Sequence, residues 1–168
     1  MKADYVAEKV YDHPIERVWA ALTSAHALAA WLMPNDFVAE VGREFTFRTD
    51  PAPGFDGVVR CRVLEIDPPT SMVWQWCGGP VDTTVTFTLT ALDGGHTRFH
   101  LRQLGFAGLG GQFTRLVLGS GWRRILGRRL PAYLGRSARG DDASASDIDG
   151  DCRRWWSLKR LVTAEGRR

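Results

Sequence analysis

The chain of 168 residues lacks the features that mark membrane and secreted proteins. Nowhere do eighteen apolar residues follow one another, so no membrane-spanning helix is predicted. The first ten residues, MKADYVAEKV, contain neither an apolar core nor an arginine-rich amphipathic pattern, and no targeting segment is expected. No internal repeat is visible. We therefore expect a cytoplasmic protein that does not insert into membranes.

Cysteine is scarce and unsuited to a structural role. Cys61, Cys77 and Cys152 are odd in number, and no two of them form a CxxC pair. This pattern argues against a disulfide framework and against a zinc site, so we interpret the three residues as free thiols in a reducing compartment.

The common catalytic and metal-binding motifs are absent as well. Neither GxSxG nor HExxH occurs, and no motif places one of the four histidines beside a serine, cysteine or carboxylate. Asp147, Asp149 and Asp151 resemble part of a calcium loop, but Leu158 stands where that loop needs a glutamate. We predict no catalytic residue, no metal site and no organic cofactor, and we favour a binding protein over an enzyme.

Charge of one sign is not concentrated enough to define a nucleic-acid site. The formal net charge is +3, and much of the excess is arginine in the final third of the chain. A solvated basic face explains this distribution, so no nucleic-acid partner is expected.

What the sequence does contain is tryptophan, with seven residues in a chain of single-domain length. A chain of this size can bury roughly two thirds of its unfolded surface without a second domain. So many tryptophans indicate an aromatic-rich interior or pocket.

Alternation of apolar and polar residues predicts an antiparallel sheet, most regularly in TTVTFTLT, which is followed by a hairpin turn at Asp93-Gly94-Gly95. The predicted strands are residues 5–11, 43–49, 58–66, 72–76, 83–90 and 97–104. Two short helices are predicted after the first strand. One spans residues 15–22, with Asp12 or His13 near its N-cap and Pro14 in its first turn, and the next begins after Ser24 and ends near Leu32.

A later segment, Gln112–Leu134, keeps the helical spacing of apolar residues. Its two apolar rows are Phe113, Val117, Gly121 and Ile125, and Leu118, Trp122, Leu126 and Leu130. Such a wide stripe must be buried, and the sheet needs a cover on its apolar face, so we predict that the sheet wraps round this helix. Gly119 and Gly121 weaken the helix and Pro131 is expected to end or kink it, which we interpret as a helix that borders a cavity.

The predicted fold class is α+β, with a curved antiparallel sheet of six to seven strands, a long C-terminal helix and an internal cavity between them. This domain covers residues 1–134. Residues 135–151 are rich in Ser, Gly and Asp and predict a flexible loop. Residues 152–168 predict a short basic, aromatic helix that packs on its own domain or forms a homodimer contact through Trp155 and Trp156.

Several phrases, in their order and spacing, resemble a known superfamily. They are HPIERVWAALT followed by AAWL, GVVRCRVLEIDPP before a tryptophan-bearing strand, and GGHTRFHLRQLGF before GWRRIL. They are similar to START-like proteins, also called SRPBCC, Bet v 1-like or helix-grip proteins, and within them to the branch of the activator of heat-shock protein 90 ATPase homologues. The resemblance covers residues 6–134.

The resemblance implies a scaffold that binds lipids, sterols, polyketides or other apolar molecules. We expect an apolar, aromatic or polyketide-like ligand between the sheet and the C-terminal helix, with Gln103 or tryptophan N–H groups fixing its orientation. The predicted ligand-facing residues are Trp31, Phe47, Val59, Cys61, Trp74, Trp76, Phe87, Phe99, Leu101, Gln103, Phe113, Val117 and Gly121.

Other functions of the scaffold stay open as alternatives. Some members are cyclases or aromatases, and others confer self-resistance to an enediyne antibiotic by sequestering it or by being cleaved at a glycine. The corresponding lid loop is predicted at Gly105, Phe106, Gly108, Gly110 and Gly111. Regulation of a chaperone ATPase is the least favoured alternative.

Overall fold

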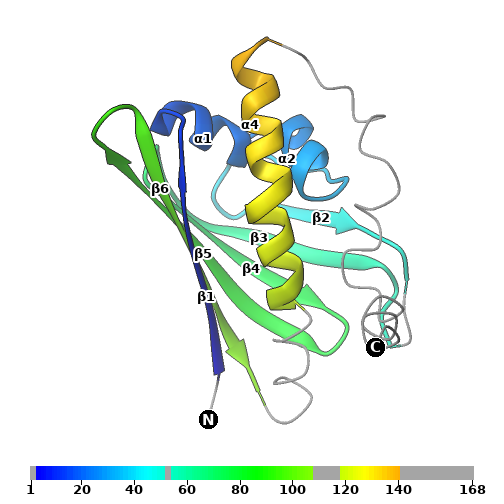
Figure 1. The fold of residues 1–168 in the computed structure, drawn as a ribbon. Coiled ribbons are helices and arrows are strands. Elements are labelled where there is room, and N and C mark those ends of the chain that lie inside the picture. The colour runs from blue at the N-terminus through cyan, green and yellow to red at the C-terminus, as the bar shows by residue number, and fades with distance from the viewer. Residues whose placement is uncertain (1–2, 52–53, 108–117, 141–168) are drawn as a thin grey trace, which may run out of the picture.

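A computed structural model describes residues 3–51, 54–107 and 118–140 of the chain. These residues form one antiparallel sheet with helices on one of its faces (Figure 1). The strands are β1 (Ala3–Tyr11), β2 (Glu44–Arg48), β3 (Val58–Asp67), β4 (Ser71–Gly78), β5 (Val81–Leu92) and β6 (His96–Phe106). Their order across the sheet is β1-β6-β5-β4-β3-β2. The first strand therefore pairs with the last, and from β2 to β6 each strand pairs with the next one in the chain.

Two short helices, α1 (Ile15–Leu22) and α2 (Ala25–Trp31), follow β1 and match the prediction closely. Ser24 caps α2, because its side chain accepts a hydrogen bond from the Ala27 N–H at 3.3 Å. The start of α1 differs from the prediction. Pro14 occupies the N-cap without a side-chain hydrogen bond, so neither Asp12 nor His13 caps this helix.

The C-terminal helix, residues 118–138, crosses the sheet (Figure 1). It is α-helical at residues 118–124, forms a π-helical turn, η1 (Ile125–Arg129), and continues as α4 (Leu130–Ala138), past the domain boundary predicted at residue 134. The described part of its apolar stripe is buried as predicted: Leu118, Trp122, Ile125, Leu126 and Leu130 are at most 6% exposed. Residues 112–117 lie outside the described ranges.

Of the two effects predicted for Pro131, ending or kinking the helix, the first does not occur, because the helix continues to Ala138 after a π-helical turn. The Leu130 N–H donates to the Ile125 carbonyl, as in a π turn, and Pro131 has no N–H to donate. The Leu126 carbonyl is therefore left without a donor from the next turn. The Tyr11 hydroxyl of β1 donates to that oxygen at 2.7 Å, which satisfies it and ties β1 to the helix.

The alternation in the strands separates two faces of the sheet. The inner face, which the helices cover, carries the core. On β4, for example, Trp74 and Trp76 are buried, whereas Gln75 between them faces outward. The outer face carries threonines and arginines, including an Arg102–Asp4 ion pair of 3.1 Å between β6 and β1. None of the described helices is long and apolar enough to span a membrane.

Candidate functional site

The predicted ligand-facing residues within the described ranges all lie on the inner face or on the helices that cover it. Trp31 belongs to α2 and Gly121 to the C-terminal helix. The sheet contributes Phe47, Val59, Cys61, Trp74, Trp76, Phe87, Phe99, Leu101 and Gln103, each at most 5% exposed. Phe113 and Val117 lie outside the described residues. The inner face is therefore the first candidate for a functional site.

The part of the inner face near β2 is an aromatic cluster, which consists of Phe37, Phe45, Phe47, Trp74 and Phe87. Trp74 is at its centre, with ring centroids 5.3 Å from Phe45 and 4.7 Å from Phe87 in edge-to-face geometry. Phe37 and Phe47 lie 5.6 Å and 5.8 Å from the same ring. Edge-to-face pairs contribute about 0.5–1.5 kcal/mol each beyond the burial of their area.

Two further tryptophans connect the aromatic cluster to the C-terminal helix. The ring of Trp122, on the helix, lies 5.7 Å from that of Trp76 and 6.3 Å from that of Phe87. Trp76 in turn lies 5.4 Å from Phe47. Large aromatic side chains thus span the layer between the sheet and this helix.

A buried chain of hydrogen bonds runs beside these rings. Trp122 Nε1 donates to Gln103 Oε1 at 3.0 Å, and Gln103 Nε2 donates to Thr83 Oγ1 at 2.8 Å. Thr83 Oγ1 donates to the Trp76 carbonyl at 3.2 Å. The prediction assigned Gln103 to a ligand, but its amide oxygen binds Trp122 of the C-terminal helix and its amide nitrogen binds Thr83 of β5.

The indole N–H of Trp74 has no hydrogen-bond partner among the described residues, unlike those of the buried Trp31 and Trp122. Trp31 Nε1 donates to the Ala21 carbonyl at 2.8 Å, and Trp122 Nε1 donates to Gln103. Trp74 is 0% exposed, and its Nε1 is buried without a hydrogen-bond partner. Such a donor is rare in folded proteins, because its desolvation is not compensated. It is therefore the polar atom of the inner face that is best placed to bind a ligand.

Tyr5 and Gly119 form a contact that was not predicted from the sequence. The Tyr5 hydroxyl donates to the Gly119 carbonyl at 3.1 Å, and a Cβ on Gly119 would lie only 2.7 Å from Tyr5 Cε2. Gly119 thus allows β1 to approach the helix closely, which corrects its interpretation as the border of an open space. Burial raises the pKa of Tyr5, although the neighbouring Arg123 opposes this shift. The alternation of Tyr5 and Tyr11 on one strand was the available signal.

The first two residues of the predicted lid loop belong to the strand that precedes it. Gly105 and Phe106 belong to β6, because Phe106 pairs with Ala3 of β1, and Phe106 is buried. Gly105 has a φ of 109°, and a Cβ there would lie 3.0 Å from the Asp82 carbonyl oxygen. Gly108, Gly110 and Gly111 lie outside the described residues.

The titratable groups of the described residues do not form a catalytic constellation. Burial raises the pKa of the Cys61 thiol well above its usual value, so a reactive thiolate is disfavoured at neutral pH. Burial, followed by the nearby Arg17, lowers the pKa of His13. No three His, Cys, Asp or Glu side chains in the described ranges gather in a way that could hold a metal ion.

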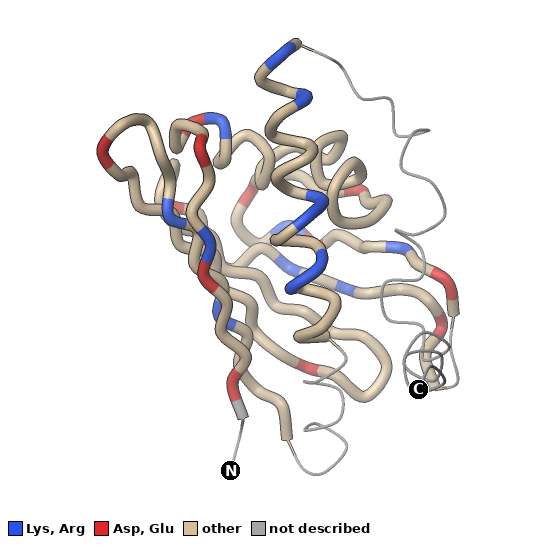
Figure 2. Tube along the Cα trace, in the orientation of Figure 1, with Lys and Arg blue, Asp and Glu red and all other residues tan. Residues whose placement is uncertain are grey.

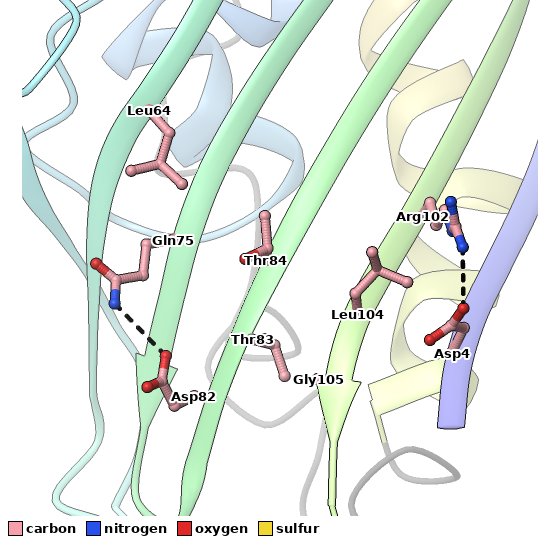
Figure 3. A pocket seen from close by; sticks show the side chains of 9 residues that line it. All are labelled: Asp4, Leu64, Gln75, Asp82, Thr83, Thr84, Arg102, Leu104 and Gly105. Atoms are coloured by element: carbon pink, nitrogen blue, oxygen red, sulfur yellow. Dashed lines mark hydrogen bonds and ion pairs between the residues drawn. The ribbon is translucent and has the colours of Figure 1, made fainter. Parts of the chain in front are cut away.

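A hollow of about 610 Å³ lies on the outer face (Figure 3). Its lining residues are Asp4, Leu64, Gln75, Asp82, Thr83, Thr84, Arg102, Leu104 and Gly105. The charged groups here already have partners, since Arg102 pairs with Asp4 and Asp82 accepts hydrogen bonds from Gln75 Nε2 at 3.5 Å and Cys77 Sγ at 3.2 Å. The hollow is a second candidate site, without an unpaired buried donor.

Charge also distinguishes the C-terminal helix from the aromatic cluster. Residues 118–140 include arginines but no aspartate or glutamate, so this helix is basic (Figure 2). Among the described residues, the buried polar side chains are Thr83, Thr97 and Gln103, none of which is charged. The aromatic cluster contains no charged side chain and suits an uncharged ligand.

An antiparallel sheet that holds a C-terminal helix against one face, with two short helices after its first strand, is the helix-grip fold. Residues 12–135 match the family model described as "Activator of Hsp90 ATPase homolog 1-like protein". The chain belongs to this family, as the resemblance predicted. A search of curated proteins found no match.

Similar solved structures share this fold. Protein MLL2253 from Mesorhizobium loti is 31% identical, with a TM-score of 0.71 over 80% of this chain and 98% of that chain. An HSP90 activator from Plasmodium falciparum, PFC0360w, is 20% identical, with a TM-score of 0.62 over 79% and 96% of the two chains. DynU16, described as a putative protein in the dynemicin biosynthetic locus, is 20% identical, with a TM-score of 0.66 over 80% of this chain and 48% of that chain.

Proposed function

We propose that this protein binds an apolar, aromatic small molecule on its inner face, between strands β2–β5 and the C-terminal helix. The observation that carries the proposal is the buried aromatic cluster whose central residue, Trp74, has an N–H without a partner. Rings supply stacking area for a flat ligand, and one buried donor supplies orientation. A core that served stability alone would gain from an apolar ring at this position.

An aromatic or polyketide-like molecule is the ligand class that fits this face best. One relative is described as a putative protein in the dynemicin biosynthetic locus. At 20% identity, that likeness carries the fold and not the ligand. The proposal for this chain therefore rests on its own rings and on the neutrality of its aromatic cluster.

Binding is tested by titrating the full chain with flavonoids, aromatic polyketides and fatty acids, followed by tryptophan fluorescence and calorimetry. We expect saturable binding of flat aromatic compounds, with quenching because Trp74, Trp76 and Trp122 surround the site. Absence of saturable binding to every compound would contradict the proposal.

The variant Thr84→Lys decides between the two candidate sites. Thr84 lines the hollow on the outer face, and a lysine there places a long charged side chain in that hollow without changing the inner face. We expect the variant to bind the same compounds with unchanged affinity. Loss of binding in this variant would instead assign the ligand to the outer face.

The same titration separates the alternatives. If mass spectrometry detects a product converted from the bound compound, the protein is a cyclase-like enzyme. Cleavage of the chain between residues 105 and 111 on exposure to an enediyne would make it a self-resistance protein. Stimulation of a heat-shock protein 90 ATPase, the activity in the family description, would support a chaperone role. We expect intact ligand, intact chain and no stimulation.

A further inference from the structure

Trp74 constrains the chemistry of the proposed ligand beyond its being apolar. Its Nε1 is buried, and no group of the described residues accepts a hydrogen bond from it. The buried side-chain amide of the inner face, that of Gln103, is already bonded to Trp122 and Thr83. Satisfying Trp74 Nε1 therefore needs an acceptor from outside this set of residues, and a bound ligand can provide one.

The surroundings of Trp74 select the kind of acceptor. A carboxylate or phosphate is unsuitable beside Trp74, because the rings that surround the indole are those of phenylalanines, which cannot compensate the desolvation of an anion. A hydroxyl would accept from Trp74 but would bring a donor of its own into the phenylalanine rings. A carbonyl oxygen accepts and does not donate, so it satisfies the indole without adding an unpaired group.

The rings around Trp74 select the shape of the group that carries the carbonyl. Phe45 and Phe87 meet the indole edge to face, with interplanar angles of 74° and 70°. A flat ligand ring that takes the place of one of these side chains beside Trp74 can make the same edge-to-face contact, whereas a branched aliphatic group cannot.

We propose that the ligand is a flat aromatic ketone or quinone whose carbonyl oxygen accepts a hydrogen bond from Trp74 Nε1. This inference rests on the proposed function, because it identifies the ligand class of the same inner face. Trp74 is then the residue that distinguishes an oxygenated ring system from the corresponding hydrocarbon.

A matched pair of probes, 9-fluorenone and fluorene, tests this inference. They share a three-ring skeleton and differ by a carbonyl in place of a methylene. We expect the wild-type protein to bind fluorenone about tenfold more tightly than fluorene, the ratio that one buried hydrogen bond supplies. In Trp74→Phe the ratio falls to about one, since phenylalanine has no N–H.

Trp31→Phe is the matched control, because it also removes one buried indole, but one whose N–H is bonded to Ala21. We expect this variant to keep the preference for fluorenone. The ratio of the two affinities is the readout, so a general loss of packing in either variant cancels. A second measurement uses the wild type alone: the ¹⁵N-indole signal of Trp74 shifts on addition of fluorenone and much less on addition of fluorene.

Several outcomes would overturn the inference and are distinct from failure of the proposed function. Equal affinity for the two probes in the wild type, with no shift of the Trp74 indole signal, means that a ring face or a buried water already accepts its N–H. If neither probe binds while aromatic compounds without a carbonyl do, the ligand is not a flat aryl ketone and the proposed function stands. If no compound binds at all, both proposals fail.

Discussion

The inner face has two halves that hold the C-terminal helix in different ways. The hydrogen-bonded half joins sheet and helix through Tyr5, Tyr11 and the Gln103–Trp122 pair, and Thr83 binds the Gln103 amide within the sheet. The aromatic cluster uses ring contacts and leaves the Trp74 N–H unpaired. Directional bonds cannot be broken without leaving donors unsatisfied, whereas a ring contact can be exchanged for contact with a ligand ring. The first half therefore fixes the helix, and the second is suited to binding.

Removal of the Trp122 side chain should produce the largest effect, because it breaks the hydrogen-bonded half at its anchor. Trp122→Ala loses the bond to Gln103 and the ring contacts with Trp76 and Phe87. We expect a loss of about 3–5 kcal/mol in the free energy of unfolding, measured by urea denaturation. A loss below about 1 kcal/mol would show that this half does not hold the helix.

Two glutamines on the same sheet provide a sharper comparison. Gln103→Leu removes both hydrogen bonds of a buried amide, so the Thr83 hydroxyl and the Trp122 N–H each lose a partner. We expect the free energy of unfolding to fall by about 1–3 kcal/mol. Gln75→Leu, on the outer face, removes only a long 3.5 Å contact with Asp82, and a change within about 0.5 kcal/mol is expected. Equal effects of the two substitutions would contradict the proposed role of Gln103.

Tyr11 should make the hydrogen-bonded half sensitive to alkaline pH. Burial raises the pKa of Tyr11 above its ordinary value of 10.0, so the folded state keeps a proton that the unfolded state loses. The contribution of protonated Tyr11 to the free energy of unfolding is fully present below pH 10 and is lost as the pH rises above that value. Tyr11→Phe should cost about 1–2 kcal/mol at neutral pH and should flatten the fall above pH 10. Unfolding curves that fall equally steeply in both proteins would contradict this.

The smallest effects are expected from substitutions of two glycines in the C-terminal helix. Gly119→Ala places a Cβ against the Tyr5 ring and should destabilise by about 1 kcal/mol, after the gain in helix propensity is subtracted. A Cβ on Gly127 would have no neighbouring atom within 4 Å, so Gly127→Ala should be neutral or stabilising by up to about 1 kcal/mol. Thermal unfolding of the two variants measures the difference, and a Gly119→Ala variant as stable as Gly127→Ala would refute the close approach of β1.

The inner face could be predicted from sequence because side chains in a strand alternate. Residues 83–90 alternate without interruption, and Val85, Phe87 and Leu89 are all buried as this pattern requires. The order of strands and helices followed from the same periodicity, and the family resemblance added the helix-grip superfamily and the classes of ligand that it implies.

The hydrogen-bonding partners could not be predicted, because they depend on how distant segments meet. The Tyr11 hydroxyl bonds a carbonyl 115 residues away, and that carbonyl is available only because a π turn precedes Pro131. Gln103 faces inward as predicted, but its partner Trp122 follows from the rotation of the helix. The extension of β6 to Phe106 likewise follows from its pairing with Ala3.

The most direct test of the ligand-binding face is a crystal structure of the wild-type protein with the tightest-binding compound from the titration. The ligand should lie against Trp74 and its neighbouring rings, with an oxygen about 3 Å from Trp74 Nε1. A ligand in the outer hollow, against Gln75 and Asp82, would contradict the account.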